Sequence, residues 1–146
     1  MSQIMDAWGR ARAAEHEGAH VSAAHHFGWV AASAELRPDG GECEVVWPEQ
    51  LGIFERERQH CIILLVASEF AGQEGGVGDR AQVFRYAMQR SSSAEVREQL
   101  LAHLRYQAIL LNADDAFRAR AYRVANALLA RGRLGASELP ALLAGD

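Results

Sequence analysis

The chain of 146 residues contains no lysine and no threonine, and fifteen arginines carry its basic charge. Nineteen acidic residues outnumber them and give a net charge of −4, so general affinity for nucleic acid or anionic lipid is not expected. Two cysteines are too few for a disulfide scaffold. The longest apolar run covers residues 61–67, far short of the roughly 20 residues that span a membrane. With no signal-peptide pattern at the start, these absences predict a cytoplasmic protein.

What the chain does contain is the composition of an ordinary globular protein, with 49% hydrophobic and 23% charged residues. Its length predicts one domain over residues 1–146. The pattern is mainly helical, except for two strand-like segments that flank the turn residues 38–41. The fold class is therefore mainly α, a single helical domain with one small β-hairpin. We expect helices at residues 3–27, 54–71, 79–90, 93–111, 116–130 and 137–143, and strands at residues 29–36 and 43–47.

Residues 16–20 read His-Glu-Gly-Ala-His inside the first expected helix. Helical residues four apart lie about 40° from each other and one turn apart, so His16 and His20 can reach one Zn²⁺ ion. Glu17 lies beside them, where its carboxylate can take a proton from a zinc-bound water and pass it to a leaving amine. Gly18 favours a site, because glycine costs ~1 kcal/mol in a helix and needs a packing reason. The alternative is a surface helix that carries two histidines by coincidence.

A catalytic zinc ion normally has three protein ligands, and two residues compete for the third place. His26 has the spacing of the metzincin ligand set, but Ala23 stands where that set has its turning glycine. If the helix continues, His26 lies about 80° off the metal face, so we expect it and His25 to be polar residues at the helix end. Asp79 follows the glycine-rich residues 72–78, which can fold back to a distant site, although capping the third helix would also explain an aspartate there.

Three further residues are weaker candidates. Glu69 lies in the otherwise apolar second helix, where a buried carboxylate needs a partner, so we expect it to support a ligand histidine or to bind the metal. His60 stands at the charged start of that helix and is expected at the surface. Glu74 is an acid of the glycine-rich loop with no spacing argument behind it.

Several stretches together resemble the peptidase domain of the FtsH-type, membrane-anchored ATP-dependent zinc proteases. Residues 14–24 resemble the zinc-binding helix of that family, with Gly18 and Ala19 in exchanged order. The hairpin, the apolar helix at 62–71 and residues 76–81 follow in the family's order, and scattered positions between 106 and 134 resemble its helical tail. In that family an aspartate after the loop completes the zinc site, and Asp79 stands at this position.

The resemblance implies a zincin-like helical domain with zinc-dependent endopeptidase activity on peptides or unfolded proteins. His16, His20 and Asp79 would bind Zn²⁺ and Glu17 would activate water, with Glu69 as a supporting residue. The resemblance also allows a homo-oligomer or a separate partner protein. The ATPase module and membrane segments of the family have no counterpart in these residues, so a catalytically silent domain of the same fold, with an interaction or regulatory role, is the alternative. A metzincin-like peptidase that uses His26 comes third.

Overall fold

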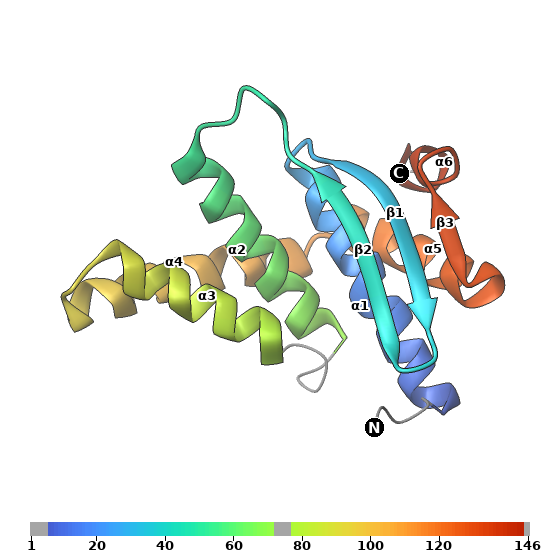
Figure 1. Ribbon diagram of the computed structural model, residues 1–146, viewed down its shortest axis with the longest axis horizontal. Coiled ribbons are helices and arrows are strands. Elements are labelled where there is room, and N and C mark those ends of the chain that lie inside the picture. Colours follow the sequence, from blue (N-terminus) through green and yellow to red (C-terminus); the bar gives the residue numbers. More distant parts are fainter. Residues whose placement is uncertain (1–5, 72–76, 145–146) are drawn as a thin grey trace.

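The computed structural model describes residues 6–71 and 77–144. Within these residues it contains six helices and a small antiparallel sheet, so the mainly helical fold class is confirmed. Figure 1 shows their arrangement. The elements are α1 (Ala7–His26), β1 (Val30–Arg37), β2 (Gly40–Val46), α2 (Ile53–Phe70), α3 (Val77–Arg90), α4 (Ala94–Asn112), α5 (Asp115–Arg131), β3 (Arg133–Gly135) and α6 (Leu139–Ala144).

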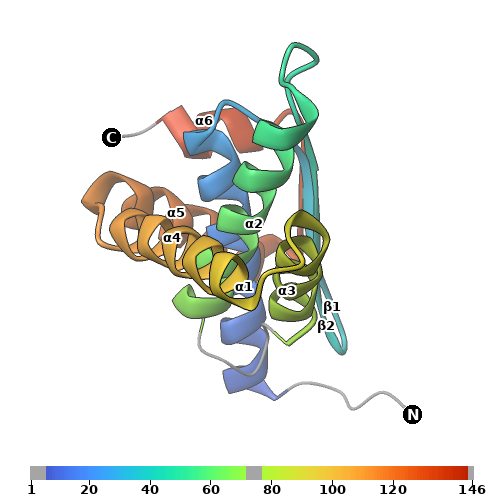
Figure 2. The ribbon, with the colours of Figure 1, turned by 90° about the vertical axis from the view of Figure 1, so that its left-hand side faces the viewer.

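Helix α1 runs through the middle of the molecule, between α5 and the β1–β2 hairpin (Figure 2). Its first turn is capped by Asp6, whose carboxylate accepts a hydrogen bond from the Gly9 amide at 2.8 Å. At the other end Gly28 has a φ of 81°, a left-handed conformation that glycine adopts without strain. The predicted first helix is thereby confirmed, with both ends set by local capping.

The sheet has the strand order β2–β1–β3 with antiparallel pairing throughout. The sequence predicts the β1–β2 hairpin and its turn, and the structure places the turn at Pro38 and Asp39. It does not predict β3, which is only three residues long and pairs Leu134 with Ala34. Such a short strand carries no periodic signal; its pairing with β1 defines it. Among the described residues no strand pairs with the outer side of β2, so this strand forms one edge of the sheet.

Helix α2 separates the hairpin from α3 and α4, which lie together on its far side (Figure 1). Its residues Cys61 to Ser68 are all buried, because α1, α3 and α4 surround it. One apolar core lies between these helices. A second core lies on the other side of α1, between the sheet, α5 and α6. Helix α1 therefore contributes to both cores.

The start of the third helix differs from the prediction, as does that of the first, which begins at Ala7 instead of residue 3. The sequence places Asp79 as the cap of the third helix, but α3 already begins at Val77 and Asp79 lies in its first turn. Its carboxylate is turned toward α1, where it contacts His16 and His20. An acid in the first turn still suits the positive end of the helix dipole. The sequence pattern around Asp79 is therefore the same whether this residue caps the helix or lies in its first turn.

Gly18 lies where α1 and α5 approach most closely. A β-carbon built at Gly18 would stand 2.4 Å from the carbonyl oxygen of Ala121 and 3.1 Å from the amide nitrogen of Ala125. One turn later, the buried Ser22 hydroxyl donates a hydrogen bond of 2.9 Å to the Phe117 carbonyl. Close packing at Gly18 was expected near a metal site. The structure shows instead that the packing partner is the backbone of α5.

We expect Gly18→Ala to destabilise the protein. Alanine is the better helix former by about 1 kcal/mol, but the backbone of α5 must shift to admit the methyl group, and overpacking of this kind costs about 1–3 kcal/mol. Urea unfolding should show a net loss. The control is Gly40→Ala, since a β-carbon at Gly40 meets no atom within 4 Å. Equal stability of Gly18→Ala and wild type would contradict the tight α1–α5 contact.

Candidate metal centre

His16 and His20 face a cavity of about 660 Å³ between α1, the hairpin and α2. They lie one turn apart on the same side of α1, as the motif predicts, and Asp79 reaches the cavity from the first turn of α3. The imidazoles are each 12% exposed and the Asp79 side chain is 22% exposed. The three predicted ligands therefore meet at one partly enclosed place, although Asp79 is 59 residues from His20.

The three polar atoms form a nearly equilateral triangle. Nε2 of His16 and Nε2 of His20 are 3.2 Å apart, and each lies 3.2 Å from Oδ2 of Asp79. A tetrahedral zinc ion with ligand distances of about 2.0–2.1 Å requires its ligand atoms to be about 3.3–3.4 Å apart. The spacing in the protein matches this requirement closely. This group of three can hold a metal ion.

The electrostatics of the three residues are coupled. Burial alone would raise the pKa of Asp79, but the hydrogen bonds that its carboxylate accepts from His16 and His20 hold that pKa well below its ordinary value. Burial would lower the pKa of His16, yet the nearby Asp79 and Glu17 carboxylates raise it overall. A positive charge is thus favoured among these side chains, in the form of a proton or of a metal ion.

The second ring nitrogen of His16 is also informative. Nδ1 is buried and has no hydrogen-bond partner among the described residues, while the nearby Ala67 carbonyl of α2 contributes to the raised pKa of the ring. Metal-binding histidines usually donate their other N–H to a carbonyl or carboxylate, which fixes the ring and its tautomer. The Ala67 carbonyl stands at the place of such a supporting group. No sequence pattern identifies a backbone carbonyl in this role.

Glu17 borders the same cavity and is only 6% exposed. Its side chain packs against β2 at Gly41, where a β-carbon would lie 2.8 Å from Cγ of Glu17. The Cys43 thiol, also on β2, lies close to the Glu17 carboxylate. Burial and this carboxylate raise the pKa of Cys43 well above its ordinary value. No ion pair among the residues described joins Glu17 to an arginine. The buried Glu17 carboxylate thus borders the cavity beside the three candidate metal ligands.

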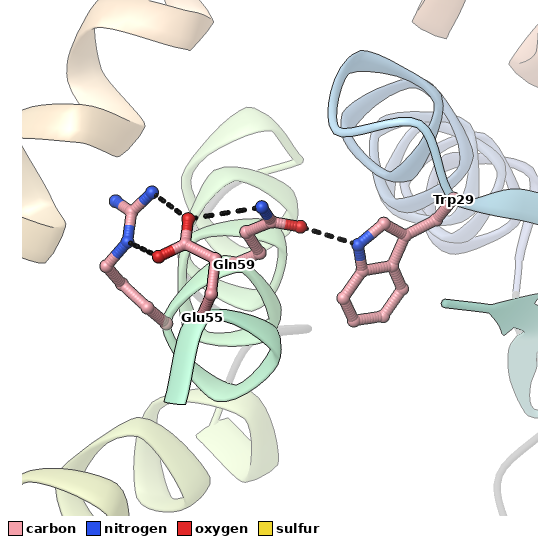
Figure 3. Close-up of polar contacts among 4 residues, drawn as sticks. Trp29, Glu55 and Gln59 are labelled. Atoms are coloured by element: carbon pink, nitrogen blue, oxygen red, sulfur yellow. Dashed lines mark hydrogen bonds and ion pairs between the residues drawn. The ribbon is translucent and has the colours of Figure 1, made fainter. Parts of the chain in front are cut away.

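His60 forms part of the opposite wall of the cavity instead of lying free at the surface. Its ring stacks on Trp29 with the centroids 6.0 Å apart. Figure 3 shows how Trp29 is held: its indole N–H donates to Gln59 at 2.7 Å, and Gln59 donates to Glu55 at 3.2 Å. Arg58 donates to the same Glu55 carboxylate. Burial, followed by the charges of His20 and other neighbours, lowers the pKa of His60, which favours the neutral ring.

The structure does not bring the other candidates to this centre. His25 and His26 are exposed at the end of α1, and the ring of His26 packs on Phe27. Glu69 is exposed near the end of α2 and accepts a long hydrogen bond of 3.5 Å from Asn112. The expectation that Glu69 is buried beside a ligand histidine is therefore wrong, because the helix turns this side chain outward. Glu74 lies outside the described residues.

Comparison of the chain with models of known protein families gives no match, and comparison with curated proteins gives none either. Among the described helices, none combines the length and the apolar character needed to cross a membrane. The geometry of the residues themselves is therefore the basis of the functional argument.

We expect the stability of the metal-free protein to peak between about pH 3.8 and 6.5, the ordinary values of Asp79 and His16. The depressed pKa of Asp79 contributes stability that is lost as the pH falls through its lower folded value. The raised pKa of His16 contributes stability that is complete below its ordinary value and is lost as the pH rises through the folded value. Urea unfolding in the presence of a chelator, over a series of pH values, measures the loss of stability at both the acidic and the basic end.

Asp79→Asn should make the stability depend less on pH at both the acidic and the basic end. It removes the carboxylate that titrates at low pH, and it also removes the negative charge that raises the pKa of His16. Asp39→Asn is the matched control, since Asp39 lines the same cavity but lies in the exposed hairpin turn. An unchanged profile in Asp79→Asn would show that these ionisations are not linked to folding.

Proposed function

We propose that the protein is a zinc-dependent metalloendopeptidase. One observation carries the proposal: the ligand atoms of His16, His20 and Asp79 stand 3.2 Å apart, at the spacing of a tetrahedral zinc site, and the buried Glu17 borders the same cavity. Two imidazoles and one carboxylate are a donor set that zinc accepts in catalytic sites, where the fourth position stays open. The resemblance of the sequence to FtsH-type peptidase domains supports the same assignment.

His16, His20 and Asp79 would hold the zinc ion, which would supply a Lewis acid and activate a water molecule for attack. The protein residues then have defined tasks. Glu17 accepts a proton at its carboxylate and returns it to the amine that leaves, which requires a carboxylate held in place and largely shielded from solvent. Gly41 and Cys43 of β2 hold it there. The Ala67 carbonyl lies near the His16 ring and would accept a hydrogen bond from its second nitrogen when the first binds the metal.

The substrate class that fits this cavity is an extended peptide or an unfolded segment of a protein. The cavity opens beside β2, the edge strand of the sheet, and FtsH-type peptidases supply the precedent for unstructured substrates. We place the enzyme in the cytoplasm, since its two cysteines are both unpaired. A homo-oligomer or a separate partner protein stays a prediction of the sequence resemblance.

The purified protein should retain about one zinc ion per chain after dialysis. His16→Ala should weaken zinc binding by more than about 100-fold, because loss of a ligand affects the metal more than loss of a supporting group does. Asp79→Ala should do the same. The controls are His26→Ala and His103→Ala, which remove exposed histidines from α1 and α4. Metal analysis and competition with a chelator give the result; a wild-type protein without affinity for zinc would refute the proposal.

Glu17→Gln should keep the zinc ion but lose peptidase activity on unfolded casein by about 10²–10⁴-fold, the usual contribution of a general base. Glu15→Gln is the matched control, because Glu15 is a neighbour on α1 that does not line the cavity. If zinc-loaded wild type and Glu17→Gln both cleave only at background level, the protein is not a peptidase. A catalytically silent interaction domain would then be the better assignment.

A further inference from the structure

Arg12 occupies the same face of α1 as the two histidines. It precedes His16 by four residues, so it lies one turn and about 6 Å nearer the start of the helix, turned by about 40°. Its side chain lines the cavity that contains the metal-binding cluster. Position along the helix thus places an arginine next to the proposed zinc centre.

Two contacts fix the direction of the Arg12 side chain. Nη1 donates a hydrogen bond of 2.5 Å to the carbonyl of Ala71, at the end of α2, and the guanidinium carbon lies 4.5 Å from the centre of the Trp8 ring. Neither contact involves a carboxylate: the Ala71 carbonyl, at the negative end of the α2 dipole, and the face of the Trp8 ring offer the guanidinium only partial negative charge. One N–H of the five that an arginine offers is used by the Ala71 carbonyl, so paired donors remain for a planar anion.

The charge of Arg12 has no carboxylate partner among the residues that the structure describes. Two of the acids that line the cavity have other contacts: Asp79 contacts the two histidines, and the Glu17 side chain packs against β2 at Gly41. The third, Asp39, lies in the exposed turn of the hairpin, where solvent screens its charge. The guanidinium of the partly buried Arg12 is therefore available to pair with a carboxylate that enters the cavity.

We propose that Arg12 binds a carboxylate group of the substrate and so determines the specificity of the cavity. This inference rests on the proposed peptidase function. Guanidinium and carboxylate can form two parallel N–H···O hydrogen bonds, which are strong and directional. An extended residue spans roughly 3.3–3.6 Å, so the bound carboxylate belongs to the first or second residue beside the peptide bond that is cleaved. It is either an Asp or Glu side chain or the carboxyl terminus of the peptide.

The test measures binding separately from cleavage. Zinc-loaded Glu17→Gln protein is titrated calorimetrically with short peptides that differ in one group: internal Glu or Gln, and a free or an amidated carboxyl terminus. One of the two acidic forms should bind about 10- to 100-fold more tightly than the neutral peptide, as a charge-assisted pair predicts. A preference for internal Glu identifies a side-chain subsite. A preference for the free terminus identifies a carboxypeptidase-like mode.

Arg12→Gln, added to the same protein, should reduce the preference to less than about twofold. The matched control is Arg56→Gln, because Arg56 lies at the same 4.5 Å from a tryptophan ring, that of Trp47, but does not line the cavity. It should keep the full preference. If the preference survives Arg12→Gln, the carboxylate binds elsewhere, for example on the metal, and the inference is wrong; equal binding of acidic and neutral peptides also overturns it.

Two further measurements keep the outcomes distinct. If Arg12→Gln does not fold, Arg12→Lys replaces it; lysine keeps the charge but cannot form the paired hydrogen bonds, so the preference should fall several-fold, and an unchanged preference overturns the inference. Cleavage by the zinc-loaded wild type is then assayed with the same peptides. If the protein cleaves all the peptides without a preference for the acidic ones, the peptidase function is supported and the proposed role of Arg12 is wrong. If the protein binds acidic peptides through Arg12 but cleaves none of them, the role of Arg12 is supported and the peptidase function is wrong.

Discussion

The close contact of α1 with α5 at Gly18 is the constraint on which the rest of the site depends. On a helix, Gly18 points roughly 160° away from both His16 and His20. Because Gly18 lies against the backbone of α5, the two histidines must face the opposite side, toward α2 and α3. The same contact leaves no room to rotate α1 about its axis. The smallest residue of the motif therefore directs its two largest polar side chains into the cavity.

The candidate metal centre brings together groups that would repel one another without a cation. Two imidazole nitrogens 3.2 Å apart cannot both present lone pairs to each other without cost, and a proton or a metal ion must lie between them and Asp79. In the metal-free protein, the raised pKa of His16 and the depressed pKa of Asp79 show that a proton between these side chains is favoured. A folded arrangement that favours positive charge at one point is suited to binding a divalent ion there.

Different elements of the fold hold the side chains that line the cavity. Strand β2 holds Glu17 through the space at Gly41 and the thiol of Cys43, and α2 contributes the Ala67 carbonyl behind His16. On the far wall, His60 stacks on Trp29, and a hydrogen bond to Gln59 holds the Trp29 indole in place (Figure 3). Each functional side chain is thus supported by an element other than its own. Rigid support of this kind is what precise positioning of a catalytic group requires.

The residue pattern was enough to predict the helices, the hairpin and the His16–Glu17–His20 face of α1, because periodicity, turns and caps act between residues close in the chain. It also indicated Asp79, through the glycine-rich stretch before it and the resemblance to FtsH-type peptidases. Three features become visible only in the folded chain: Asp79 meets the histidines, Glu69 turns outward and β3 pairs with β1. These outcomes depend on how helices rotate and pack against partners distant in sequence, and a backbone carbonyl such as that of Ala67 leaves no trace in the residue pattern at all.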